Sequence, residues 1–269
     1  MVRVVIHAGF HKTGTTSVQT TARDNAALLR PHARIYLKDG FRNLTDAART
    51  YSAKPTPKAL DAVHDHAHAF FRQLNRNDPR PVALLSEDLS GHLPGRHGIA
   101  DYRAAPDLMA QVAAACVAVL GDGVDLRLRF STRAADPWLR SAYWQILRSA
   151  RRTEGPEEFA RIFAPAADFD ELITDIARAV APFPVEATAL EDLRDATEGP
   201  ITPILDLLEI PPETRAKLVL GAPANVRPEG LDEVFLALNR CGLPDGKVAM
   251  LKKTTLRVAR RLQEKSDKP

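Results

Sequence analysis

The chain has 269 residues and a formal net charge of +3, with 37 Lys and Arg against 34 Asp and Glu, so its overall charge argues against a nucleic-acid-binding protein. Its apolar content of 45% and charged content of 26% are ordinary for a globular protein. No apolar run approaches the roughly 18 residues that span a membrane, and the first residues lack the pattern of a signal peptide. We therefore expect a cytoplasmic protein without a transmembrane segment.

The first stretch with a chemical signature follows an apolar run at residues 2–6, which predicts a strand. Two glycines, a lysine and a group of hydroxyl residues come next, and a helical pattern begins near Thr15 and continues to Leu29. A loop between a strand and a helix N-terminus turns main-chain N–H groups toward a ligand, the helix dipole favours negative charge, and Lys12 adds a positive charge. This stretch predicts a site for a phosphate or a similar anion. The alternative is an ordinary strand-turn-helix unit with an exposed lysine.

The order of residues in this loop narrows the choice of ligand. In the NTPase P-loop the lysine directly follows the last glycine, whereas Lys12 lies two residues before Gly14. The order Lys-Thr-Gly-Thr-Thr-Ser resembles the loop with which sulfotransferases that use 3′-phosphoadenosine-5′-phosphosulfate (PAPS) hold the 5′-phosphosulfate. The resemblance implies that Lys12 neutralises charge on the leaving phosphate, while the main-chain N–H groups of residues 14–17 and the hydroxyls of Thr15 and Thr16 hold the 5′-phosphate. The residues expected to bind the donor here are Lys12, Thr13, Gly14, Thr15, Thr16 and Ser17.

The next segments predict a short strand at residues 33–37, a polar loop with one helical turn at most at residues 39–57, and an amphipathic helix at residues 58–74. Three histidines alternate along this helix, and only His64 and His68 share a face. No carboxylate-rich pattern surrounds them. We interpret them as solvated side chains rather than metal ligands.

A continuous apolar run at residues 81–86 predicts a strand that is buried on both faces of a parallel sheet, and it is followed by Glu87 and Asp88. Ligands of open parallel sheets lie beyond the carboxyl ends of the strands, so Glu87 is a candidate to face the same crevice as the loop. The alternative, a helix cap or a solvated acid, is the preferred interpretation of Asp88. The glycine-rich segment at residues 89–106 predicts a loop that contributes to a substrate pocket.

A strand predicted at residues 124–131 leads to Arg133, and a helix follows in which Asp136 suits the N-cap and Pro137 the first turn. PAPS sulfotransferases place an arginine at the end of a strand and a serine eight positions later on the following helix, and both bind the 3′-phosphate. Arg133 and Ser141 have this separation. The resemblance therefore implies that they hold the 3′-phosphate of PAPS and select it over ordinary nucleotides.

The remaining chain predicts a helix at residues 168–180, a last strand at 185–190, and several shorter helices. The late Arg-Lys-Gly segment of cytosolic sulfotransferases is missing, and a nucleotide contact from Asn225 or Arg227 is left open. Residues 246–269 form a basic tail, which we expect to be a solvated helix. Peripheral contact with an anionic membrane or an acidic glycan is the alternative.

Together these elements predict a single α/β domain over residues 1–269, a P-loop NTPase-like three-layer sandwich. A central parallel sheet of about five strands would be flanked by helices on both faces, with helical additions toward the C-terminus. The oligomeric state is left open.

The resemblance implies transfer of a sulfuryl group from PAPS to a hydroxyl or amine acceptor, such as a glycan or another small molecule, without a metal ion. The base that takes the acceptor proton is Glu87 by first choice, His11 by second and His92 by third. Two rival hypotheses remain: a nucleotide-dependent phosphotransferase with an atypical P-loop, and a non-catalytic relative that binds a nucleotide or a glycan. The identity of the acceptor is left open.

Overall fold

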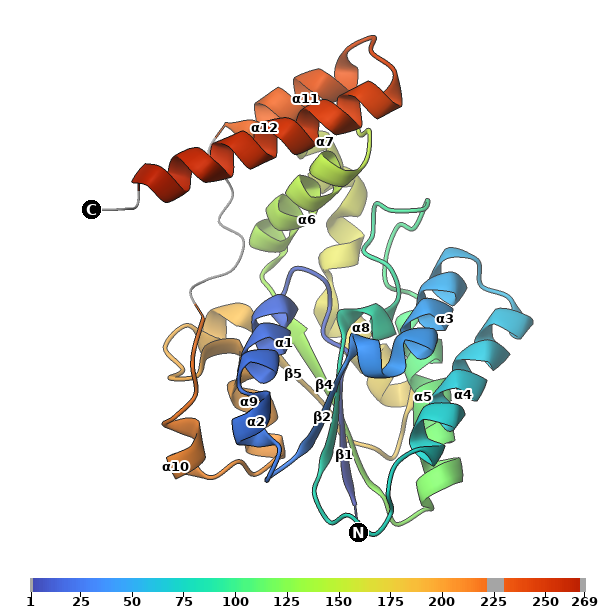
Figure 1. The fold of residues 1–269 in the computed structure, drawn as a ribbon. Coiled ribbons are helices and arrows are strands. Elements are labelled where there is room, and N and C mark those ends of the chain that lie inside the picture. The colour runs from blue at the N-terminus through green and yellow to red at the C-terminus, as the bar shows by residue number, and fades with distance from the viewer. Residues whose placement is uncertain (1, 222–229, 267–269) are drawn as a thin grey trace.

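The computed structural model describes residues 2–221 and 230–266, and it has an α/β fold around a five-stranded, entirely parallel sheet (Figure 1). The strand order is β2-β3-β1-β4-β5, which places the N-terminal strand in the centre. The strands are β1 (Arg3–His7), β2 (Arg34–Leu37), β3 (Val82–Leu85), β4 (Asp125–Thr132) and β5 (Val185–Ala189).

The central strands are apolar because helices cover both faces of the sheet. Val4, Val5 and Ile6 of β1 are all fully buried. Side chains alternate between the faces, so Val5 packs in one core and Val4 and Ile6 in the other. The edge strand β5 is more polar and more exposed. The sheet class and the strand positions predicted from the sequence are confirmed.

One face of the sheet carries the smaller core, to which Val18, Leu29, Ile204 and Leu205 contribute. Its helices are α1 (Thr15–Asp24), α2 (Ala26–Leu29), α9 (Thr202–Leu207) and α10 (Pro212–Arg215), with 3-10 turns η4 (Leu190–Leu193) and η5 (Gly199–Ile201) nearby. The single helix predicted through Leu29 is instead two helices, because the Asn25 side chain bonds to main-chain groups of Thr21 and Val219.

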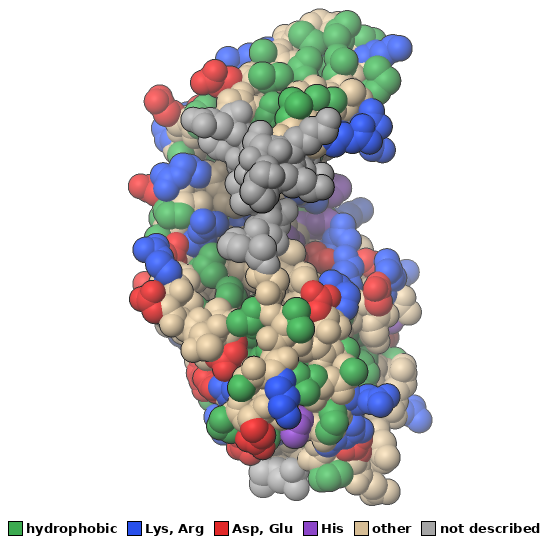
Figure 2. Space-filling view, turned by 60° about the vertical axis from the view of Figure 1, so that its left-hand side comes forward, with side chains coloured by type: hydrophobic (Ala, Val, Ile, Leu, Met, Phe, Trp, Pro, Cys, Tyr) green, Lys and Arg blue, Asp and Glu red, His purple; other side chains and the backbone are tan. Residues whose placement is uncertain are grey.

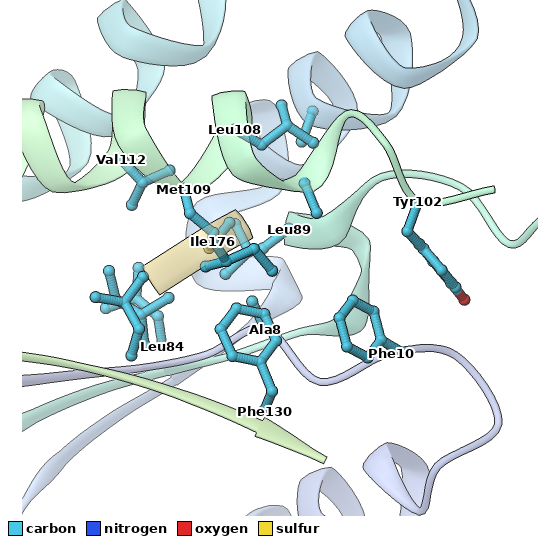
Figure 3. Packing of buried hydrophobic residues seen from close by; sticks show 14 of the residues in the cluster. Ala8, Phe10, Leu84, Leu89, Tyr102, Leu108, Met109, Val112, Phe130 and Ile176 are labelled. Atoms are coloured by element: carbon cyan, nitrogen blue, oxygen red, sulfur yellow. The ribbon is translucent and has the colours of Figure 1, made fainter. Parts of the chain in front are cut away.

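The other face carries the larger core (Figure 3). Phe10 and Phe130 lie on the sheet side, and Leu108, Met109 and Val112 project toward it from α5. The helices of this face are α3 (Arg42–Ala53), α4 (Pro57–Arg72), α5 (Ala105–Leu120) and α8 (Phe169–Ala179), and the 3-10 turns are η1 (Lys38–Phe41) and η2 (Glu87–Ser90).

The loop predicted for residues 39–57 was wrong, because most of it is the helix α3. The breakers Gly40, Pro55 and Pro57 flank the helix instead of interrupting it. Small and aromatic residues, among them Ala48 and Tyr51, form its buried face, and the Tyr51 hydroxyl donates to the Asp107 carboxylate of α5 at 2.6 Å. Tertiary packing therefore stabilises a helix whose apolar stripe is weak in the sequence.

A layer of helices lies beyond the carboxyl ends of the strands (Figure 1): α6 (Ala135–Ser149), α7 (Pro156–Phe163) with the turn η3 (Ala164–Ala167), α11 (Leu231–Arg240) and α12 (Asp245–Ser266). Trp144 of α6 stacks on Phe235 of α11, with ring centroids 5.3 Å apart. The buried Lys252 ammonium of α12 donates to the carbonyls of Leu147 and Ala150, at 2.7 and 2.9 Å. The basic tail is thus docked at its beginning rather than solvated throughout. None of the helices in the described ranges has the length and apolar character needed to cross a membrane.

The chain order creates a crevice at the carboxyl edge of the sheet. From β1 the chain passes toward β2, and from the neighbouring β4 it passes toward β5, in the opposite direction. Open α/β sheets bind ligands at such a switch point, beyond the carboxyl ends of the strands. The loops after β1 and β4, which carry the two predicted phosphate-binding groups, meet there.

The last residue of β1 makes the stability of the fold depend on pH. Burial, and then the positive charge of Arg129, lower the pKa of His7 to about 3, and no described residue bonds to its Nδ1 atom. Since the unfolded histidine has a pKa of about 6.5, the unfolded chain binds one more proton at this position between the two values. The free energy of unfolding should therefore fall as the pH falls through this window, by up to about 1.4 kcal/mol per unit.

Urea unfolding of the wild-type protein and of His7→Leu between pH 4 and pH 7 tests this expectation. The variant should show the smaller pH dependence, whereas His66→Asn, on the exposed side of α4, should match the wild type. Equal slopes in the wild type and His7→Leu would contradict the role of His7.

Candidate functional site

A cleft of about 1210 Å³ lies between the carboxyl edge of the sheet and the helical layer. Figure 2 shows Lys and Arg side chains in the middle part of the molecule, below the helical layer at its top. Of the eleven residues predicted from the sequence to bind the donor or to act as the base, nine line this cleft, and Thr13 and His92 do not. The nine are His11, Lys12, Gly14, Thr15, Thr16, Ser17, Glu87, Arg133 and Ser141.

The loop after β1 has an unusual main-chain conformation. Lys12 and Gly14 have φ angles of 70° and 96°, in the left-handed region that glycine tolerates and lysine adopts only under constraint. The carbonyl of His11 accepts a hydrogen bond from Trp138 Nε1 at 2.8 Å, and that of Lys12 accepts one from Arg133 Nη1 at 3.2 Å. With these carbonyls held, the N–H groups of residues 12–16 make no hydrogen bond to any residue that the structure describes.

The loop is anchored to the larger core through Phe10. This ring stacks on Phe130 and Phe169, with centroids 5.4 and 4.9 Å apart, and lies 4.9 Å from Tyr102 (Figure 3). Gly9 precedes it because a β carbon there would lie only 2.3 Å from Ser131 Oγ. The loop is therefore a fixed part of the core surface, already shaped before a ligand arrives.

Thr13 is the one predicted donor-binding residue whose side chain does not face the cleft. It is fully buried, its hydroxyl donates to the Phe10 carbonyl at 2.6 Å, and its oxygen lies 2.7 Å from Ser131 Oγ of β4. The hydroxyl thus ties the loop to the neighbouring strand. Thr13 was predicted as a donor-binding residue without a role for its hydroxyl, and its main-chain N–H is the group left for a ligand.

The cleft has an excess of positive charge among the described residues. Eight Lys or Arg side chains line it against four carboxylates, an excess of four. Burial lowers the pKa of Lys12, and the charges of Arg148 and Arg133 lower it further. Arg133 Nε is buried without a hydrogen-bond partner among the described residues, and the Glu191 carboxylate is 3.7 Å away. Most of these cations were not predicted from the sequence, namely Lys38, Arg49, Arg96, Arg140, Arg148 and Arg194.

Helix α6 turns one face to the cleft, with Pro137, Ser141, Gln145 and Arg148 at helical spacing. Asp136 was predicted as the N-cap, but the helix begins at residue 135 and no side chain caps it. Instead, the Glu191 carboxylate accepts from the preceding main-chain N–H of residue 134, at 3.3 Å. Ser141 still lies in the second turn, and it lines the cleft together with Arg133.

The two acidic residues after β3 have different surroundings. Glu87 lines the cleft and accepts a hydrogen bond from the Gln19 amide of α1 through Oε2. Asp88 was interpreted as a cap or a solvated acid, but its side chain is only 15% exposed, and it pairs with Lys38 and with His11 Nε2 at 3.3 Å. Burial acts to raise the pKa of Asp88, yet the hydrogen bonds and charges of His11 and Lys38 outweigh it and hold the pKa below its ordinary value.

Both ring nitrogens of His11 are engaged. Nδ1 lies 3.3 Å from the Tyr102 hydroxyl, whose oxygen also accepts from the His11 main-chain N–H at 3.2 Å. Burial raises the pKa of Tyr102, so the hydroxyl keeps its proton. The contacts of Nδ1 with Tyr102 and of Nε2 with Asp88 fix the orientation of the His11 ring.

His92, the third candidate base, is not among the residues that line the cleft. Its Nδ1 lies 3.4 Å from Arg49 Nε, and burial followed by the charge of Arg49 lowers the pKa of His92 to about 4. Asn225 and Arg227 lie outside the described residues. Within the described ranges, no group of three or more His, Cys, Asp or Glu side chains is arranged to hold a metal ion.

Comparison with known proteins returned no match to a protein-family model, a curated protein or a solved structure. A functional interpretation of the cleft therefore depends on its residues and their contacts.

The buried hydroxyl of Thr13 should be more important for stability than for ligand contact. Thr13→Val keeps the shape but leaves the Phe10 carbonyl and the Ser131 hydroxyl without their partner, so we expect a loss of about 1–3 kcal/mol of unfolding free energy. Urea denaturation measures it, with Thr174→Val on the exposed side of α8 as the matched control. Equal losses in the two variants would contradict a structural role specific to Thr13.

Proposed function

We propose that this protein is an enzyme that transfers a sulfuryl group from PAPS to a hydroxyl or amine acceptor. One observation carries the proposal: Arg133, the predicted 3′-phosphate residue, donates to the carbonyl of Lys12 in the predicted 5′-phosphate loop, at 3.2 Å. Two separate halves of the resemblance thus meet in one cleft. They are more than a hundred residues apart in the chain.

The residues of the cleft fit a doubly phosphorylated nucleotide. The unbonded N–H groups of residues 12–16 and the hydroxyls of Thr15 and Thr16 suit the 5′-phosphate at the start of α1, where the helix dipole favours an anion. The Arg133 guanidinium, whose Nε has no hydrogen-bond partner among the described residues, and the Ser141 hydroxyl suit the 3′-phosphate. Turns η4 and η5, which also line the cleft, are in place to cover the rest of the nucleotide.

The arrangement favours Glu87 over His11 as the base. Both ring nitrogens of His11 already have partners, whereas Glu87 uses only Oε2, and no described residue bonds to Oε1. In the reaction the acceptor oxygen or nitrogen forms a bond to sulfur as the bond from sulfur to the 5′-phosphate oxygen breaks. Glu87 takes the acceptor proton, and Lys12 stabilises the charge left on the phosphate. His11 and Asp88 hold the loop in position.

Two other functions predict different ligands. A nucleotide-dependent phosphotransferase would bind ATP more tightly than 3′,5′-diphosphoadenosine (PAP), the product of sulfuryl transfer. A non-catalytic relative would bind PAP without turnover of PAPS. Calorimetric titration with PAP, ATP and AMP, followed by an acceptor screen with labelled PAPS, separates the three.

Removing the groups assigned to the 3′-phosphate should weaken PAP binding selectively. We expect Arg133→Ala to raise the Kd for PAP by roughly 10- to 100-fold, because it loses a charged hydrogen bond to the phosphate. Ser141→Ala should raise it by roughly 3- to 10-fold, because it loses a neutral one. Ser141→Ala should leave the Kd for AMP unchanged, because AMP has no 3′-phosphate. Arg178→Ala, at an exposed position on α8, should behave as the wild type. Tighter binding of ATP than of PAP by the wild type would refute the proposal.

Neutralising the proposed base should affect turnover and leave donor binding intact. Glu87→Gln keeps an oxygen that can accept from Gln19, so we expect kcat with the best acceptor of the screen to fall roughly 10²- to 10⁴-fold with an unchanged Kd for PAP. Glu158→Gln, at an exposed position on α7, serves as the control. Full activity in Glu87→Gln together with inactivity in a folded His11→Gln would transfer the role to His11.

A further inference from the structure

The cleft contains cations that the donor does not require. Arg49 of α3 and Arg96, in the loop between η2 and α5, line the cleft together with His11 and Glu87. The elements that carry Arg49 and Arg96 belong to the face of the sheet opposite α1. Residues assigned above to the donor come from the loop after β1 and from the start of α6. Arg49 and Arg96 therefore form a second cationic group, on the side of the proposed base.

The carboxylates nearest to Arg49 are Asp88 and Asp46. Asp88 pairs with Lys38 and His11, and lies 4.0 Å from Arg49 Nε. Arg49 also has the Asp46 carboxylate at 3.6 Å from Nη1. Arg49 is therefore largely balanced within the fold.

Arg96 differs from Arg49 in its contacts. Its Nη2 donates to the Ser149 hydroxyl at 3.0 Å, and no carboxylate among the described residues lies within ion-pair distance of its guanidinium. The side chain is only partly exposed. Burial, and then the charge of Arg49, lower the pKa of Arg96, and the charge of the Asp88 carboxylate offsets only part of this effect. A partly buried guanidinium without an ion-pair partner among the described residues is stabilised when an anionic ligand pairs with it.

The charge of Arg96 also acts on the reaction centre. Arg148 and Arg96 are both among the cations that lower the pKa of Lys12. Arg96 and Lys12 also line the same cleft, so a ligand bound there can contact both side chains. Gly95 is buried beside Ile146 of α6, and its carbonyl accepts from Arg152 at 3.0 Å, which fixes the loop next to Arg96.

We propose that the acceptor carries an anionic group, a carboxylate or a sulfate or phosphate ester, in addition to the hydroxyl or amine that receives the sulfuryl group, and that Arg96 binds this anion. This inference rests on the proposed function, because it assigns the second cationic group to the acceptor. It defines the acceptor class as an acidic sugar or a similarly charged small molecule, which a neutral alcohol or phenol cannot replace.

Three glycosides that differ at one carbon test the proposal: 4-nitrophenyl β-D-glucoside, the corresponding glucuronide and the corresponding glucoside 6-sulfate. Each is titrated by calorimetry into protein saturated with PAP, so that the donor loop and Arg133 are occupied and cannot bind the anion. We expect one or both of the charged glycosides to bind at least tenfold more tightly than the neutral one. The two charged probes distinguish a carboxylate from a sulfate ester.

The variant Arg96→Gln should remove this preference, while the exposed Arg103→Gln, in the same loop, should retain it. Equal or undetectable binding of all three glycosides by the PAP-loaded protein overturns the inference, as does a preference that survives in Arg96→Gln. Urea unfolding checks that each variant is folded.

Failure of the proposed function has a different signature, namely that PAP itself does not bind. In that case the same titrations on the nucleotide-free protein decide whether Arg96 selects the charged glycosides. The titration with PAP therefore tests the proposed function, and the titrations with the glycosides test the inference about the acceptor.

Discussion

The direction of two carbonyl groups determines what the loop after β1 can bind. A peptide group is planar and trans, so its N–H points away from its carbonyl. Trp138 and Arg133 hold the carbonyls of His11 and Lys12, and the N–H groups of Lys12 and Thr13 in the same peptides point the other way. Both donors follow β4, so the anion site is formed only when β1 and β4 pair in the folded sheet.

The positive charge of the cleft follows from the same packing. Lys12 and Arg133 approach each other because Arg133 bonds to the loop that carries Lys12, and like charges at this distance oppose folding. The core contacts of Phe10 and the buried hydroxyl of Thr13 hold the loop in place despite this repulsion. A bound anion would relieve it, so the site combines local electrostatic strain with a rigid support.

The C-terminal helices take part in the site without lining the described cleft. Lys252 and Asn239 donate to carbonyls at the end of α6, and Trp144 stacks on Phe235 of α11. These contacts fix the position of α6, which carries Ser141 and Arg148 into the cleft. The basic character of the tail is thus partly explained by Lys252, which satisfies carbonyls at a helix C-terminus.

The sequence by itself determined the parallel sheet and the location of the loop, because apolar runs, glycines and hydroxyl residues act over short stretches. It also placed Glu87 and Arg133 correctly at strand ends, where parallel topology brings them to one edge. Only the tertiary structure decided that Thr13 faces the core, that Asp88 is paired and that Arg96 has no ion-pair partner within the described ranges. Each of these depends on contacts between residues that are distant in the sequence, and the local sequence pattern does not show which residues make such contacts.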